Sequence, residues 1–265
     1  MSLSNNVDLK NPATKPMQWS SDHSAFKYWD KTKGEQKEDG TFTGANIIVA
    51  LPLTFIVLDT LSTIRGYSKT DKCGYYSNEV RDLKKEILVV KNKTGECEKG
   101  LYADIIRSEH IKGAKYCQSV YIAHKESETL VIANIQMVGS CLSAWIDFRK
   151  KNDVYKGAVS VSGFEEKVNG KTTYNEPIFK FIPVSETTKK EAIELDKILQ
   201  EYLVKYFNKS KIDQVTQAPV EFREFRDLRS KDSLGKEEII STVEQFNPQD
   251  SDTPPQEYET DDLPF

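Results

Sequence analysis

The sequence predicts a mainly β protein with added helices, an α+β fold organised around a small Greek-key barrel. Three observations lead to this expectation. Between residues 46 and 182, β-branched and aromatic residues dominate short segments that polar turns separate. One segment with helical spacing lies between two of these strands, and a second, longer one follows the last strand. Strand number alone leaves a β-sandwich open as an alternative to a barrel of the OB-fold type.

The strands are expected at 47–64, 74–76, 86–91, 114–125, 129–138, 154–164 and 172–182. The first is long or bent, with an interruption near Pro52, because proline removes a backbone donor from a ladder. The last four segments predict two hairpins. In the second hairpin, Asn169-Gly170 favours a type I′ turn, since both central positions of that turn need positive φ.

Three helices are expected. The first is short, at 101–110, and the second, at 139–151, places Trp145 on its apolar side and therefore in the core. The third begins after Pro183, where Thr188 and Glu191 have capping-box spacing, and extends to about Phe207. Its apolar face consists of Ala192, Leu195, Leu199, Tyr202 and Tyr206.

The ends of the chain differ from its middle in composition. Residues 1–45 are polar but hold several aromatic residues, which predicts an N-terminal arm that docks on the core or on a ligand. The core with its C-terminal helix is expected at 46–212, and a linker or weak helix at 213–246. Residues 247–265 contain four prolines and six acids, so they are expected to be a disordered acidic tail.

Charge is distributed unevenly along the chain. It holds 37 Lys and Arg against 41 Asp and Glu, a net charge of −4. Six of the acids and none of the bases lie in 247–265, which leaves the first 246 residues at +2. A mildly basic body joined to an acidic tail allows the tail to compete with an anionic ligand for the body.

Several other classes of protein find no support in the sequence. The N-terminus has no signal-peptide pattern and the most apolar run is too short to span a bilayer, so we expect a cytoplasmic protein without a membrane partner. Cys73, Cys97, Cys117 and Cys141 are too widely spaced for a zinc site and are expected to be free thiols. Because no catalytic motif is present, we expect no enzyme, no metal and no cofactor.

The C-terminal tip is the sharpest signal. Two carboxylates precede an apolar residue, a proline and a terminal phenylalanine: Asp261, Asp262, Leu263, Pro264 and Phe265. The ring and the terminal carboxylate of Phe265 together form a compact ligand for a partner with an apolar pocket beside a basic group.

At these residues the chain resembles the single-stranded-DNA-binding proteins of bacteria and bacteriophages, and its body resembles the phage type. The cues in the body are the stretches 27–31, 47–60 and 133–136. The resemblance implies an OB-fold, sequence-independent protection of single-stranded DNA in replication or recombination, and location in the cytoplasm of the host bacterium. It also implies that the tail recruits replication proteins such as a polymerase, a helicase-primase or recombination factors. The long N-terminal stretch and the helices at 139–151 and 188–207 depart from the short bacterial type.

A sequence-tolerant site for single-stranded DNA needs cations along the phosphates and aromatic faces against the bases. Several stretches interleave the two, and on the 114–125 strand the odd positions form a face expected to be solvated. The expected DNA-binding residues are Lys27, Tyr28, Trp29, Lys31, Arg65, Tyr67, Lys69, Lys72, Tyr75, Tyr76, Lys91, Lys93, Lys99, Tyr102, Lys115, Tyr121 and Lys125.

Two other functions stay open from the sequence. The first alternative is an adaptor that does not bind DNA and whose acidic tail recruits a partner. The second is a nuclease, since scattered carboxylates can assemble a two-metal site without a recognisable motif.

Overall fold

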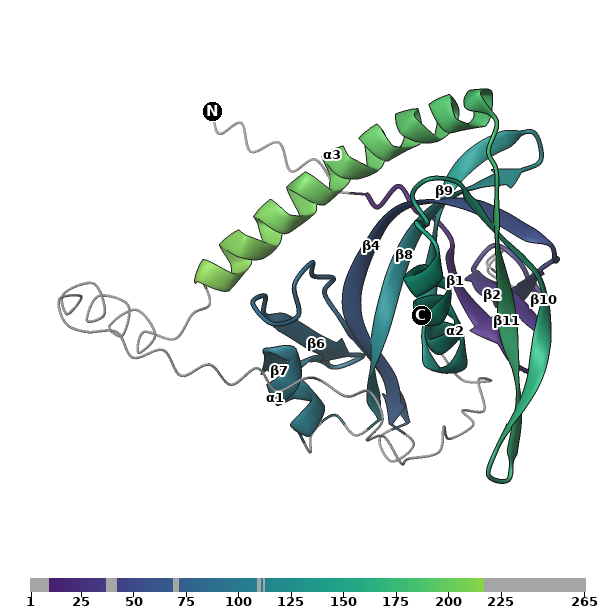
Figure 1. Cartoon of the computed structure of the whole chain (residues 1–265). Helices are drawn as coiled ribbons and strands as arrows, with labels where there is room; N and C mark the ends of the chain where they lie inside the picture. The colour runs from purple at the N-terminus through teal and green to yellow at the C-terminus, as the bar shows by residue number, and fades with distance from the viewer. Residues whose placement is uncertain (1–9, 37–41, 69–71, 109–110, 112, 217–265) are drawn as a thin grey trace, which may run out of the picture.

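The computed structural model describes residues 10–36, 42–68, 72–108, 111 and 113–216, the last seven of these as backbone only. In this part of the chain, eleven strands form one mixed sheet with three helices (Figure 1). This confirms the expectation of a mainly β fold with added helices. Residues 213–216, expected to begin the linker, continue the last helix, and the rest of the linker and the acidic tail lie outside the described residues.

The strands are β1 (Pro16–Ser20), β2 (Ala25–Asp30), β3 (Ala45–Val49), β4 (Leu53–Ser68), β5 (Cys73–Ser77), β6 (Leu88–Asn92), β7 (Gly95–Gly100), β8 (Ala114–Glu126), β9 (Thr129–Met137), β10 (Ala158–Asn169) and β11 (Thr172–Ile182). The helices are α1 (Tyr102–Arg107), α2 (Gly139–Lys151) and α3 (Glu186–Thr216). Along the sheet the order is β3-β2-β1-β9-β8-β4-β5-β6-β7, and β10 pairs with both β4 and β11. Every pairing is antiparallel except that of β1 with β9.

The 16-residue strand β4 is the spine of the molecule. One of its edges pairs with β8 over nearly its whole length. The other edge pairs with β10 at its beginning, at Leu53–Ile56, and with β5 at its end, at Arg65–Ser68. The two ends of β4 therefore belong to two lobes, a large one with β10 and β11 and a small one with β5, β6, β7 and α1 (Figure 1).

A bulge in β4 between Val57 and Asp59 changes which residues face inward. Before the bulge, Phe55 and Val57 enter the main core, where α2 contributes the fully buried Trp145. After the bulge, Ile64 enters a second core under the small lobe, together with Leu88 and Val90 of β6. The expected helix at 139–151 and the core position of Trp145 are both confirmed.

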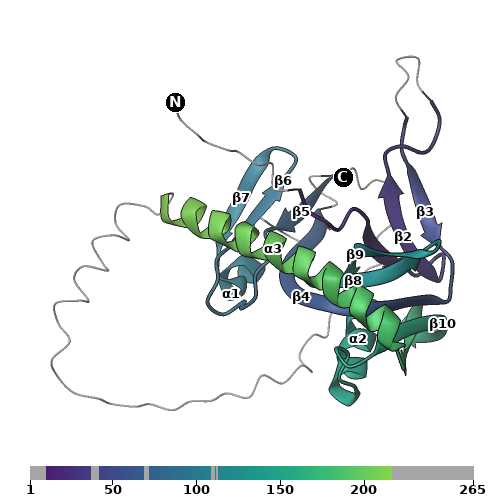
Figure 2. The same cartoon turned by 90° about the horizontal axis from the view of Figure 1, so that it is seen from above.

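Helix α3 covers the opposite face of the sheet, which we call the outer face (Figure 2). Leu199 and Leu203 are fully buried there against Leu61 of β4 and Tyr121 of β8. The helix begins at a Ser185 cap, whose Oγ accepts from the backbone N–H of Thr188 at 3.2 Å, so the expected capping role of Thr188 was wrong. Its apolar face was expected, but the sheet that it covers was not.

The stretch expected as an N-terminal arm contributes β1 and β2 to the sheet and Met17, Trp19 and Phe26 to the main core. Strand β1 also approaches β11. The indole N–H of Trp19 donates to the Asn175 carbonyl at 2.8 Å, and the Asn175 N–H donates to Ser21 Oγ at 2.7 Å. Side chains make these bonds, and among the described strands no ladder joins β1 to β11, so the sheet does not close into a barrel.

Two boundaries differ from expectation for local reasons. The second hairpin turns at Gly170-Lys171 rather than at Asn169-Gly170, because Asn169 pairs with Thr172. Only Gly170 has positive φ there, at 63°, which is the requirement of a type II′ turn and not of type I′. The long apolar run does break near Pro52, as expected, and forms β3 and β4.

Candidate nucleic-acid interface

Four of the expected DNA-binding residues form a line across four neighbouring strands. Lys115 of β8 pairs with Arg65 of β4, Arg65 pairs with Tyr76 of β5, and Tyr76 pairs with Lys91 of β6. Residues that lie directly opposite each other in an antiparallel ladder project from the same face of the sheet. We call this line of three cations and one aromatic ring the basic row.

The basic row lies on the outer face, the same face that α3 covers further along β4 and β8. Leu61, Thr63 and Arg65 alternate along β4 toward this face, whereas Ile64 points into the second core. Tyr76 is 49% exposed and Lys91 is exposed, while Arg65 and Lys115 are half-buried. The row therefore offers a ring and a cation to solvent at one end and a more enclosed pair of cations at the other.

Other expected residues flank the basic row. Tyr67 follows Arg65 by two positions and pairs with Gly74, so it projects from the same face. Lys99 of β7 pairs with Val89, which precedes Lys91 by two positions, and it too lies on this face. Lys93 occupies the turn between β6 and β7, and Lys72 is exposed at the start of β5 with a φ of 46°.

Two expected residues, Tyr75 and Tyr121, are core residues instead, and a third, Tyr102, is half-buried against the second core. Tyr75 is 5% exposed and faces the second core, because it is the neighbour of the outward-facing Tyr76 and alternation turns it the other way. Tyr102 packs edge-on against Tyr116, with 6.0 Å between ring centroids, and burial raises its pKa. Tyr121 is 1% exposed beneath α3. The outer face of the 114–125 strand was expected to be solvated, and at Tyr121 this expectation was wrong.

A second set of expected residues lies away from the basic row, with Lys27, Tyr28, Trp29 and Lys31 on or next to β2 and Lys125 near the far end of β8. Ten residues of extended strand, about 33 Å, separate Lys125 from Lys115. Tyr28 and Lys125 line a common pocket, and Trp29 packs its ring onto Gly44 in the β2–β3 hairpin. The expected residues thus form two groups and not one continuous groove.

The remaining expected residues cannot be placed. Lys69 lies outside the described residues, as do the five tip residues Asp261, Asp262, Leu263, Pro264 and Phe265.

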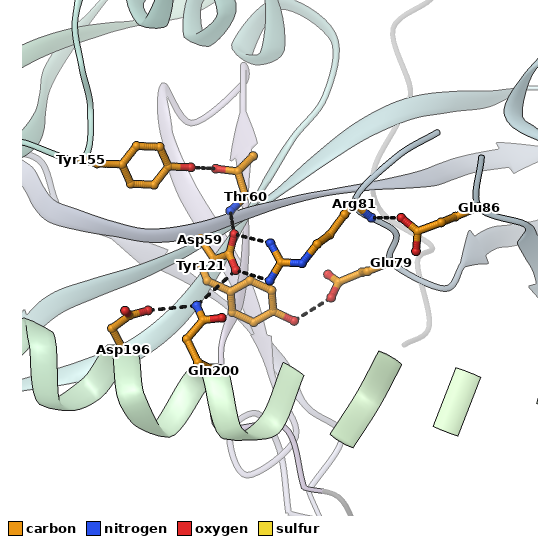
Figure 3. A network of polar contacts seen from close by, with 9 residues as sticks. All are labelled: Asp59, Thr60, Glu79, Arg81, Glu86, Tyr121, Tyr155, Asp196 and Gln200. Carbon is orange, nitrogen blue, oxygen red and sulfur yellow. Dashed lines mark hydrogen bonds and ion pairs between the residues drawn. The ribbon is translucent and has the colours of Figure 1, made fainter. Parts of the chain in front are cut away.

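A polar network connects α3 to Asp59 of β4 (Figure 3). The Asp59 carboxylate accepts from both terminal nitrogens of Arg81, at 3.3 and 2.9 Å, and from Gln200 of α3 at 3.2 Å. Further along α3, the ring of Phe207 lies 5.3 Å from the guanidinium carbon of Arg81. Sequence reasoning missed Arg81 and Gln200, since neither belongs to an aromatic–basic stretch and they are distant in sequence.

Glu79 connects this network to the strands. Its carboxylate accepts from Tyr121 Oη at 2.7 Å and from Ser119 Oγ, and its backbone N–H donates to Tyr206 Oη at 2.8 Å. Burial raises the pKa of Glu79, and burial lowers the pKa of Arg65, which lies within electrostatic range of it. The mutual attraction of Glu79 and Arg65 partly offsets both shifts.

The described residues contain no cluster of three or more His, Cys, Asp or Glu side chains able to hold a metal ion. All four cysteines are free, as expected. None of the helices in the described ranges has the length and apolar character that crossing a membrane requires. No family model matches the chain, and no curated protein or solved structure is detectably similar to it.

Proposed function

We propose that this protein binds single-stranded DNA without sequence preference, and that the basic row is the center of the binding surface. The observation that carries the proposal is the pairing of Lys115, Arg65, Tyr76 and Lys91 across four strands on one open face. Cations that follow the phosphates and rings that stack on bases are the two components that sequence-tolerant binding needs.

The order of the elements supports a core of the OB type. Strands β4, β8 and β9 form a meander, α2 follows, and the β10–β11 hairpin returns so that β10 pairs with β4. This is the order of five strands with a helix between the third and the fourth. In the OB-fold, the loop between the first two strands is one of the oligonucleotide-binding loops. Here the corresponding connection, between β4 and β8, carries β5 and β6 and with them half of the basic row.

The position of α3 defines the limits of the proposed surface. In the OB-fold the second and third strands also contribute to binding, but here α3 covers Tyr121 of β8 and Ile132 of β9 on the outer face. The strand of DNA would therefore run across the small lobe, over β5 and β6, and not along the middle of β8.

The acidic tail has two roles in this proposal. Its six carboxylates visit the basic row and compete with the phosphates, and its tip, ending in Phe265, recruits replication proteins. Both roles would be useful to a phage protein that acts in DNA replication or recombination.

The test is a titration of fluorescently labelled oligo(dT) with the full chain, measured by anisotropy. Wild-type protein should bind oligo(dT) and mixed-sequence single strands with similar affinity and duplex DNA more weakly. Tyr76→Ala should weaken binding by about 1–3 kcal/mol, the contribution of one stacked base. Tyr155→Ala is the matched control, because Tyr155 is 52% exposed on the other lobe and should have no effect on affinity.

Two results would count against the proposal. If wild-type protein fails to bind oligo(dT), the adaptor function that the tail also allows becomes the better explanation. If the Tyr76 and Tyr155 variants lose affinity equally, the basic row is not the site.

A further inference from the structure

Strand β3 forms a free edge of the sheet. Among the described strands it pairs only with β2, in a regular register that runs from Val49 opposite Phe26 to Ala45 opposite Asp30. In Figure 2 it lies at the margin of the molecule, on the side opposite β6 and β7. An edge strand presents a row of backbone N–H and C=O groups to which another strand can bind.

Two other edge strands of the described sheet are protected against such pairing. Strand β7 carries three charged residues among its six, and charges on an edge oppose the approach of a second strand. Strand β11 contains Pro177, which has no backbone N–H. In β11 the backbone N–H and C=O of Asn175 are also already bonded to Ser21 and Trp19.

Strand β3 has none of these protections. It contains no charged residue and no proline, its pairing with β2 has no bulge, and three of its five residues are β-branched. Ile48, which lies opposite Lys27 of β2, is 43% exposed. Phe42, three residues before the strand, is 41% exposed. An uncharged, β-branched edge beside exposed apolar side chains is typical of a strand that pairs with another strand.

The charges near β3 favour a second copy of this chain over the acidic tail as the partner. Lys15 and Lys125 line one pocket with Ala50, the residue after β3, and they form ion pairs with Glu126 and Glu128. At this pocket an acidic segment would find the positive charges already matched. A second β3 brings no charge with it, so no like charges on the two strands would lie opposite each other.

We propose that β3 pairs with β3 of a second copy, antiparallel and across a two-fold axis at Ile47, the middle residue of the strand. This arrangement joins two sheets edge to edge and places Asn46 of each copy opposite Ile48 of the other. An edge of five residues is far smaller than a standard interface of about 800 Å² per partner, so the dimer should be weak. The pairing requires no DNA and does not depend on the proposed function.

Sedimentation velocity of the full chain without DNA tests the pairing. Wild-type protein should sediment as a monomer at about 5 µM and shift toward a dimer by about 500 µM, as a weak interface requires. Ile48→Lys places a charge on the edge and should raise the dissociation constant by about tenfold or more. Val168→Lys is the matched control, because it makes the same kind of change at a β-branched residue that is 69% exposed in β10. It should dimerise like wild type.

A mixture of two variants tests the register and separates loss of pairing from loss of fold. Ile48→Lys and Asn46→Glu place opposite charges on facing positions of the two copies. Their equimolar mixture should therefore form a heterodimer about tenfold tighter than the dimer that either variant forms alone. Asn46 is already polar and exposed. If Ile48→Lys loses its melting transition, Asn46→Lys takes its place and is mixed with Ile48→Glu.

Three results would overturn the proposal. Wild-type protein could remain monomeric up to about 500 µM, the variants at Ile48 and Val168 could weaken the dimer equally, or the folded variants could form no heterodimer. A chain without residues 247–265 identifies the other possible occupant. If this chain dimerises while wild type does not, the tail covers the edge. If neither dimerises, β3 does not pair with a second copy.

Discussion

Removal of charge from the basic row should change the salt dependence of DNA binding by a calculable amount. The row and its flanks hold six cations, which are Arg65, Lys72, Lys91, Lys93, Lys99 and Lys115. For single strands the slope of log K against log salt is about −0.7 per neutralised phosphate, so six contacts give about −4.2. The double variant Lys91→Gln/Lys115→Gln removes two contacts, and its slope should be about −2.8.

The same relation gives the loss of affinity. If the contribution of a phosphate contact vanishes at 1 M salt, one contact strengthens binding about eightfold at 50 mM and about threefold at 200 mM. The double variant should therefore bind oligo(dT) about 60-fold more weakly at 50 mM but only about 10-fold more weakly at 200 mM. Anisotropy titrations at four salt concentrations measure both quantities.

A matched control separates the row from overall charge. Lys189 and Lys190 are exposed near the N-terminus of α3. The double variant Lys189→Gln/Lys190→Gln makes the same change of net charge at this position, outside the basic row. We expect its slope to equal that of wild type. Equal slopes for the two double variants would refute the reasoning, because binding would then respond to net charge and not to the row.

The remaining predictions concern stability and the tail. Tyr75→Ala should destabilise the protein by about 3–5 kcal/mol in chemical denaturation, and Leu199→Ala by about 2–5 kcal/mol, because both side chains are buried. The carboxyl of Glu79 has a folded pKa above its unfolded value of 4.5, so its stabilising contribution is present below that value and is lost as the pH rises through the folded pKa. Glu79→Gln should flatten this decline in denaturation curves measured between pH 4 and 8. Deletion of 247–265 should raise affinity for oligo(dT), most at low salt, and a decrease would contradict tail competition. Deletion of Phe265 alone should leave DNA affinity nearly unchanged while abolishing partner capture in a pull-down with replication proteins.

Much of the secondary structure follows from the sequence, because its causes are local. The helical spacing around Trp145 produces α2 at the expected residues, and Pro52 interrupts the long apolar run where expected. The strands β1, β2 and β7 were not expected. Their segments are short, and pairing with β9, β3 and β6 stabilises them as strands, which no local pattern reports.

The chemical components of the candidate site were also visible in the sequence, but not their arrangement. Lys115, Arg65, Tyr76 and Lys91 come from three separate stretches, and only the pairing of β8, β4, β5 and β6 aligns them. The order of strands in a sheet depends on contacts between residues distant in the chain. Composition and periodicity carry no information about such contacts.

Tertiary packing also determined which aromatic rings are buried. Alternation requires that Tyr75 and Tyr76 face opposite ways, but the position of the second core determines that Tyr75 is inside. Tyr121 lies on the face expected to be solvated, and α3, which begins 65 residues later, covers it. The sequence determined that these strands have two distinct faces. Only tertiary packing determined which element contacts each face, because the burial of a side chain depends on the other elements that pack against its strand.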